Sequence, residues 1–219
     1  ANTGTFYVEI AENSLFGPWT PYDGNGQIII NETWVNDASN PAPFIFANGT
    51  VLLYFSSTNC PPDWGLYPRC ISMARSSTGW QGPYQTLGSL PIVRPESEDP
   101  AVWQDPRGNF HLLTNVNTGH KRCASQVPCG GHAWSYDGLT WSEQFIGAFG
   151  PVIHLKNGTV WLNSYTERPQ VYQNAERQPI TFFVGMGRTS YYDSISWAQP
   201  FCNQQLLEQG HCGPTIPVE

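Results

Sequence analysis

Charged residues are scarce in this sequence. Asp, Glu, Lys and Arg make up 12% of the 219 residues, and the formal net charge is -7. Proteins that bind nucleic acid need clustered Lys and Arg to neutralise phosphates. This chain has only 10 basic residues, and they are scattered along its length. The composition therefore argues against a nucleic-acid partner.

Long apolar runs are absent as well. No stretch approaches the roughly 20 residues that a membrane-spanning helix needs, so we expect no membrane span. The opening residues, ANTGTFYVEI, lack the basic and apolar regions of a signal peptide. We therefore interpret the sequence as a mature or excised segment.

Metal and cofactor motifs are also lacking. There is no Cys-x-x-Cys pair, and the histidines show no ligand spacing, so we expect no metal site and no cofactor. Aromatic residues, in contrast, reach 14% and outnumber the charged ones. A surface that relies on uncharged polar groups and aromatic edges suits an extracellular protein that meets sugars.

The six cysteines fall into three local couples. Nearest-neighbour pairing predicts the disulfides Cys60–Cys70, Cys123–Cys129 and Cys202–Cys212, although other pairings are possible in principle. Each bridge would close one loop and stabilise the fold by roughly 2–3 kcal/mol. A zinc site or free thiols remain the alternative interpretation of these residues.

Three Asn-x-Ser/Thr sequons indicate a secretory route. Those at Asn48 and Asn157 are Asn-Gly-Thr turns at the tips of expected hairpins, where a glycan would reach solvent, and the third is at Asn31. Together with the disulfides, the sequons predict a secreted, N-glycosylated protein.

Short alternating apolar runs, broken by Gly and Pro, predict an all-β fold. The chain contains 21 Gly and 19 Pro, spread evenly, and such punctuation is typical of many short strands. The best candidate for a helical turn is CNQQLLEQGHC, near the end of the sequence.

Two kinds of hairpin alternate along the chain. The first kind opens at a proline, in Asn40-Pro41, Asp99-Pro100 and Arg168-Pro169, and the second ends in a turn before Trp, as in GGHAWSYDGLTWS. A copy of the second kind opens the chain with no hairpin of the first kind before it. This alternation predicts a β-propeller of four-stranded blades, with about 3.5 blades present and roughly four to five if completed.

A β-sandwich is the alternative fold that many short strands leave open, although it does not predict the alternation of hairpins. The segment GPVIHLKNGTVWLN is a candidate for one extra hairpin. We place the propeller at residues 1–201 and a disulfide-closed segment with an extended tail at residues 202–219.

Three motifs carry a resemblance to a known family. The stretches EDPAVWQDPRGNFHLL, GGHAWSYDGLTWS and ERPQVYQNAERQPITFF resemble blade motifs of the family-43-like glycoside hydrolase superfamily, especially of a poorly characterised eukaryotic branch. The resemblance extends from about Phe6 to Pro200. It implies a five-bladed propeller whose first inner half-blade is missing from this sequence.

The resemblance also implies roles for individual carboxylates. These enzymes use one acid to protonate the leaving oxygen, one base to activate water and a further Asp that tunes the acid. By this comparison Glu167 matches the general acid and Asp99 the tuning Asp. Asn40 stands at the strand start of the preceding blade, where its amide cannot take a proton.

The general base is not found. In the family it comes from the first blade, and this sequence is expected to begin after the inner hairpin of that blade. The other available carboxylates do not occupy the repeating slot (Asp23, Asp37 and Asp63). Glu98, beside Asp99, is expected on the opposite side of an extended strand. The structural alternative to catalysis is an interblade ion pair of Glu167 and Arg168, in which Arg168 reaches Asp99 or Glu98 across the funnel.

Three functional hypotheses follow. The first is a carbohydrate-binding propeller that has lost catalysis and binds glycans or polysaccharide in a funnel formed by the two carboxylates above together with Asn40, Trp103, His132 and Arg168. The second is a structural subunit of an extracellular glycosylated fibre, completed by strand exchange with copies of itself. The third is an active inverting glycosidase whose base lies outside this segment.

Overall fold

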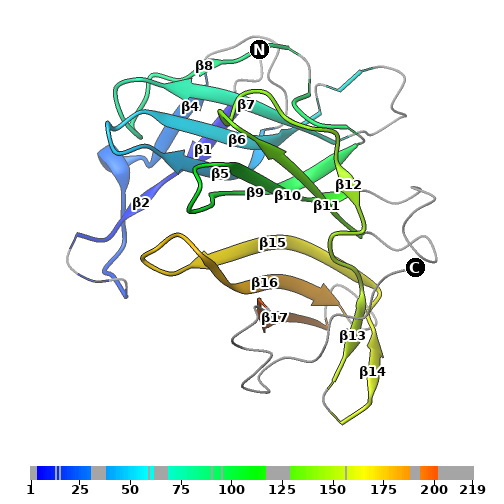
Figure 1. Ribbon diagram of the computed structural model, residues 1–219. Helices are drawn as coiled ribbons and strands as arrows, with labels where there is room; N and C mark the ends of the chain where they lie inside the picture. The colour runs from blue at the N-terminus through cyan, green and yellow to red at the C-terminus, as the bar shows by residue number, and fades with distance from the viewer. Residues whose placement is uncertain are drawn as a thin grey trace.

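The computed structural model confirms a nearly all-β fold (Figure 1). It describes residues 4–12, 14, 16–30, 38–58, 60–61, 69–89, 91–94, 96–116, 129–155, 157–187 and 193–201. Within these ranges the one helical element is a short 3-10 turn, η1 (Tyr22–Gly24). The predicted helical turn and the segment 202–219 lie outside the described residues, as does Asn31.

Two four-stranded antiparallel sheets form the centre of the structure. The second blade contains β5 (Ser39–Ile45), β6 (Val51–Ser57), β7 (Cys70–Ser76) and β8 (Gln85–Thr86). The third blade contains β9 (Ser97–Gln104), β10 (Phe110–Val116), β11 (Cys129–Ser135) and β12 (Phe145–Ile146). In both sheets the strands follow sequence order, which is the arrangement of a propeller blade.

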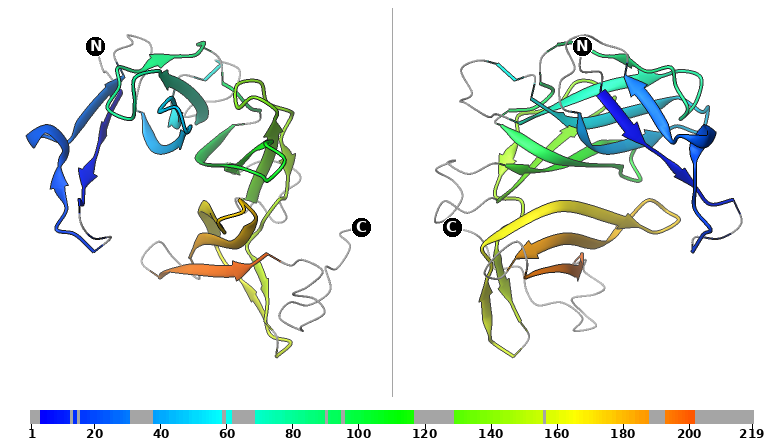
Figure 2. Two further views of the ribbon diagram at one scale, coloured as in Figure 1. Left: turned by 60° about the vertical axis from the view of Figure 1, so that its left-hand side comes forward. Right: turned by 180° about the vertical axis from the view of Figure 1, so that it is seen from behind.

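Smaller sheets flank these two blades. The first blade consists of two strand pairs, β1 (Gly4–Tyr7) with β4 (Gln27–Ile30) and β2 (Glu9–Ile10) with β3 (Thr20–Pro21). The fourth blade contains β15 (Tyr165–Gln173), β16 (Pro179–Gly187) and β17 (Ser194–Pro200). The four blades follow one another along an open arc (Figure 2). The blade-by-blade prediction is therefore confirmed.

An extra hairpin lies between the third and fourth blades, in the segment where the sequence indicates one. Its strands are β13 (Val152–His154) and β14 (Val160–Leu162). Asn157 is exposed at its tip, and Asn48 is exposed between β5 and β6. In each turn the Asn Oδ1 accepts the backbone N–H of the Thr two residues later at 3.0 Å. Both sequons therefore occupy hairpin tips, as predicted.

The hydrophobic core is divided into layers between successive blades. Between the first and second blades, Phe6 and Ile30 pack with Phe55. Between the second and third, the fully buried Tyr54 and Leu112 belong to one cluster. A four-stranded sheet has two apolar faces, so each blade is stabilised by burying them against its neighbours.

One predicted disulfide is present in the described part of the chain. Cys60 and Cys70 are bonded, with their Cα atoms 5.7 Å apart. Cys129 is disulfide-bonded too, but its expected partner Cys123 lies outside the described residues, as do Cys202 and Cys212. No described cysteine is free. No helix within the described ranges is long and apolar enough to cross a membrane.

Candidate functional site

The three innermost strands each carry one residue in a left-handed conformation. Asn40 in β5 has φ 52°, Asp99 in β9 has φ 54° and Arg168 in β15 has φ 54°, and each directly precedes a proline. Few residues other than glycine adopt positive φ, and such outliers gather at functional sites. The repeat of Asn40-Pro41, Asp99-Pro100 and Arg168-Pro169 is thus a repeat of backbone conformation.

Each of these positions coincides with an irregularity in strand pairing. The register shifts between Ser39 and Ala42 in β5 and between Glu167 and Gln170 in β15, and opposite β9 it shifts between Leu113 and Asn115 in β10. In a regular strand, successive side chains point to opposite faces of the sheet. An irregularity of this kind changes the direction in which nearby side chains point. It lets neighbouring inner strands meet through these residues.

Asp99 is the centre of this arrangement. It is 4% exposed, and its backbone N–H donates to Ser56 Oγ at 3.1 Å. The Asn40 side-chain amide donates to Asp99 Oδ1, and the backbone N–H of Arg168 donates to Asp99 Oδ2 at 3.2 Å. One carboxylate therefore joins the second, third and fourth blades.

Burial determines the electrostatics of the acidic pair. Burial raises the pKa of Asp99, and the charge and backbone N–H of Arg168 act against this rise. Burial also raises the pKa of the half-buried Glu98, and the nearby charge of Asp99 adds to the effect. Glu167 and Arg168 also act on Glu98. The left-handed turn at Asp99 thus brings Glu98 within electrostatic range of the same cluster.

Glu167 does not occupy the slot equivalent to Asp99. Arg168 holds that backbone position, and Glu167 stands one residue before it. The Arg168 guanidinium donates through Nη1 to Glu167 Oε1 at 2.8 Å, with the side chains 67% and 16% exposed respectively. The two side chains therefore form an ion pair within β15, which differs from the interblade pair that the sequence suggests. Arg168 reaches Asp99 through its backbone.

Two cavities adjoin this cluster. The axial cavity, of about 120 Å³, is lined by Asn40, Pro41, Asp99, Pro100, Arg168 and Gln170. A second cavity, of about 410 Å³, shares Arg168 and Gln170 with it. Its lining combines the polar residues Glu167, Tyr165, Ser194 and Ser196 with the apolar residues Phe183, Val184, Met186 and Ile195. Amide, hydroxyl, carboxylate and guanidinium groups together can both donate to and accept from a polyhydroxylated ligand.

Two residues predicted for the funnel lie elsewhere. Trp103 is 9% exposed and clusters with Ala101 and Leu113, against which Phe182 packs from the fourth blade. Trp103 and His132 both line a different cavity, of about 690 Å³, and neither lines the axial cavity. They lie further along β9 and on β11, so the structure does not bring them to the axial cavity with Asp99.

The structure adds residues that the sequence did not single out. Gln170 is exposed and lines both the axial cavity and the 410 Å³ cavity, while Ser56 accepts a hydrogen bond from the backbone N–H of Asp99. Nδ1 of His111 lies 3.0 Å from Nε2 of His132. Within the described residues, no group of three or more His, Cys, Asp or Glu side chains is arranged to hold a metal ion.

The chemistry available to this cluster is recognition of hydroxyl groups. Asp99 already accepts hydrogen bonds on both carboxylate oxygens, and Glu167 accepts from a guanidinium. Asn40 contributes an amide, which can donate and accept hydrogen bonds but cannot take a proton from water. Each of these groups can bind a sugar hydroxyl.

Comparison with known proteins identifies the fold. No family model matches the chain, and no curated protein matches its sequence. Among solved structures, an endo-arabinase from Bacteroides thetaiotaomicron is similar, with 18% identity and a TM-score of 0.58 over 83% of this chain and 62% of that chain. A thermostable family-43 glycoside hydrolase has 12% identity and a TM-score of 0.57 over 93% of this chain and 69% of that chain.

A third similar structure is an endo-1,4-beta-xylanase from Bacteroides thetaiotaomicron, with 14% identity and a TM-score of 0.55 over 93% of this chain and 72% of that chain. These likenesses show that the chain has the fold of the family-43 glycoside hydrolase propellers, as the motifs predict. The chain spans 62% of the endo-arabinase, less than two thirds of its length.

Proposed function

We propose that this chain is a secreted, glycosylated carbohydrate-binding propeller that binds a saccharide at the axial cavity without cleaving it. The observation that carries the proposal is the hydrogen-bonded set of Asn40, Asp99 and Arg168, which fills the three equivalent inner-strand positions. Polar groups that hydrogen bonds hold in fixed positions can recognise ring hydroxyls at little conformational cost.

The character of the lining supports a saccharide over other ligands. Gln170 and the Arg168 side chain are exposed at the cavity, where they can donate to hydroxyl oxygens, and Glu167 can accept from hydroxyl groups. One of the similar structures, an enzyme from Xanthomonas citri with a TM-score of 0.53, is a complex with xylotriose. Its ligand supports short oligosaccharides as the first class to test.

The hydrogen bonds of the side chains in this cluster support the proposal that a bound saccharide is not cleaved. An inverting glycosidase needs a carboxylate free to take a proton from water and a carboxylic acid free to give one. In the described cluster Asn40 cannot act as a base, and both oxygens of Asp99 accept hydrogen bonds from neighbouring blades. Sugar binding needs neither proton transfer.

A second candidate is an active glycosidase whose base lies outside this segment. It is favoured by one observation, that Glu167 is partly accessible and lines the 410 Å³ cavity. A third candidate, a subunit of an extracellular fibre, rests on the sequence repeats alone.

The test compares binding and turnover on the same material. Wild-type protein is applied to a glycan array and, separately, incubated with arabinan, xylan and galactan while reducing ends are measured. We expect saturable binding, no release of reducing sugar, and binding about tenfold weaker in Gln170→Ala, which loses one or two hydrogen bonds. Gln27→Ala, at an exposed position of the first blade, is the matched control and should bind normally.

Three results would contradict the proposal. Release of sugar that is lost in Glu167→Gln would support the enzyme instead. Failure to bind any glycan on the array would remove carbohydrate recognition. Regular fibres in electron micrographs, formed without added glycan, would support the structural subunit.

A further inference from the structure

A large cavity between the third and fourth blades differs in character from the axial cavity. It measures about 690 Å³, a volume typical of small-molecule sites, which span roughly 300–1,000 Å³. Its floor contains the buried side chains of Leu113, Ile153 and Met186, and its rim contains the exposed Phe145 and Val152. It shares no lining residue with the axial cavity.

The walls of this cavity are aromatic. Phe149 and Phe182 lie with their ring centroids 5.2 Å apart, and the aromatic lining also includes Trp103, Phe145, Trp197 and Phe201. A saccharide would have to bury hydroxyl groups against these walls and the aliphatic floor, where each one left without a partner costs free energy. A flat apolar molecule would instead bury its surface favourably.

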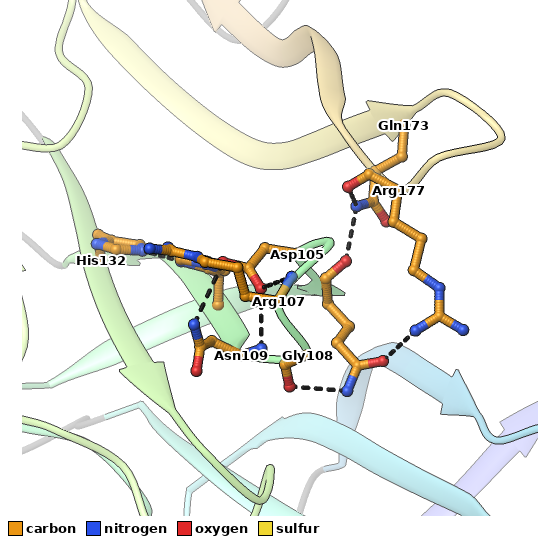
Figure 3. Close-up of polar contacts among 9 residues, drawn as sticks. Asp105, Arg107, Gly108, Asn109, His132, Gln173 and Arg177 are labelled. Carbon is orange, nitrogen blue, oxygen red and sulfur yellow. Dashed lines mark hydrogen bonds and ion pairs between the residues drawn. The ribbon is translucent and has the colours of Figure 1, made fainter.

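His132 is a polar residue in the lining, and its neighbours determine its tautomer. Asp105 Oδ2 lies 3.5 Å from His111 Nε2, and His111 Nδ1 lies 3.0 Å from His132 Nε2. Figure 3 shows His132 and the Asp105 loop at the two ends of this row. The Asp105 carboxylate is held in turn by the backbone N–H of Asn109 and by Arg107 Nε, each at 2.9 Å.

The contacts from Asp105 to His111 and from His111 to His132 determine which ring nitrogen of His132 carries no proton. A carboxylate only accepts, so Asp105 draws the His111 proton to Nε2 and leaves His111 Nδ1 as an acceptor. His132 then donates from Nε2, and its Nδ1 carries a lone pair and no proton. Stacking fixes the rings in this arrangement, with centroids 5.0 Å apart for Trp103 and His111 and 5.3 Å for His111 and His132.

We propose that this cavity binds a small aromatic alcohol of the phenol class, whose hydroxyl donates to His132 Nδ1 while its ring packs between Trp103, Phe149 and Phe182. The aromatic walls select the flat apolar body, and the lone pair on His132 selects the hydroxyl. The site shares no lining residue with the axial cavity, and the proposal does not depend on saccharide binding there.

The test uses the whole chain and two probes that differ in one group. 2-Naphthol carries the hydroxyl donor, and 2-methoxynaphthalene has the same rings but no donor. We measure both affinities by titration calorimetry with wild type and with His132→Phe. A single hydrogen bond predicts that wild type binds 2-naphthol about tenfold more tightly than the methoxy compound. In His132→Phe this preference disappears.

A variant at the rim of the cavity provides a second test of the proposal if His132→Phe folds poorly. Phe145 is 63% exposed, so Phe145→Asp should fold, yet it places a charge at the mouth of the cavity and should weaken both probes. Leu139→Asp, at an exposed position whose side chain lines a different cavity, is the matched control and should bind normally.

The outcomes separate this proposal from the saccharide site. Retention of 2-naphthol binding in Gln170→Ala supports a distinct site, whereas competition by a bound oligosaccharide overturns it. Equal affinity for the two probes in wild type, or no saturable binding of 2-naphthol, also overturns the proposal.

Discussion

Asp99 Oδ2 accepts the backbone N–H of Arg168 at 3.2 Å, so a side chain of the third blade hydrogen-bonds the backbone of the fourth. Asp99 Oδ1 accepts from Asn40 of the second blade. The residue that the resemblance assigns to tuning an acid is therefore also the link between three inner strands. Its role in stability can be measured separately from any role in binding.

Substitution of Asp99 should destabilise the fold in proportion to the hydrogen bonds lost. Asp99→Ala leaves the amide of Asn40 and the N–H of Arg168 without their acceptor, at a cost of about 2–4 kcal/mol in the free energy of unfolding. Asp99→Asn keeps one acceptor oxygen and should lose less. Urea denaturation measures both, with the exposed Glu176→Ala as control. Equal effects of Asp99→Ala and Glu176→Ala would contradict the linking role.

The boundary between the second and third blades contains a buried hydrogen bond of the same kind. Tyr54 is 0% exposed, and its hydroxyl donates to the carbonyl oxygen of Gly138 at 2.7 Å. Tyr54→Phe should reduce the free energy of unfolding by about 1 kcal/mol, because Trp141 Nε1 still donates to that carbonyl at 3.2 Å. Tyr136→Phe, 76% exposed, is the control. A loss no larger than that of the control would contradict this assignment.

The burial of His132 beside His111 predicts how the stability of the fold changes with pH. Burial, followed by the nearby His111, lowers the pKa of His132 from 6.5 to about 4. The unfolded chain therefore binds this proton more tightly than the folded one, so the contribution of His132 to stability falls as pH drops from about 6.5 towards 4. NMR titration of the imidazole should give a midpoint well below 6.5.

A variant without this imidazole separates the effect of His132 on stability from the effects of the carboxylates. His132→Phe removes the titrating group, so its stability should fall less than that of wild type between pH 7 and pH 4.5. Glu98 and Asp99 have raised pKa values and act in the opposite direction, but they are common to both proteins. A His132 midpoint at or above 6.5 would contradict the burial of this ring against the fourth blade.

The Cys60–Cys70 bridge closes a short loop, with a sequence separation of 10. Replacement of both residues by Ala should lower the free energy of unfolding by about 2–3 kcal/mol, because the unfolded chain gains conformational freedom. Urea denaturation under non-reducing conditions measures this without disturbing the bridge at Cys129. An unchanged midpoint would show that the bridge does not restrain the unfolded chain.

The features that the sequence predicts correctly are local. Proline after Asn40, Asp99 and Arg168 marks each inner strand, and Asn-Gly-Thr marks hairpin tips at Asn48 and Asn157, since turn chemistry depends on adjacent residues. Cys60 and Cys70 are close in the chain, so their pairing needs no knowledge of the fold.

The features that escape prediction depend on how blades pack. Trp103 and Asp99 lie on the same strand, and only the packing of the fourth blade shows that Trp103 is covered. The contact of His111 with His132 depends on the register of β10 against β11, where Leu113, and not His111, is the direct partner of His132. The positive φ of Arg168 is unexpected too, because Arg has no local preference for it.

The most direct test of saccharide binding without cleavage is titration calorimetry of wild-type protein with xylo- and arabino-oligosaccharides, followed by chromatography of the recovered sugar. The account predicts saturable binding that is weakened in Gln170→Ala and retained in Gln27→Ala, with every oligosaccharide recovered intact. Recovery of shortened products from wild type but not from Glu167→Gln, or no heat of binding with either series, would contradict it.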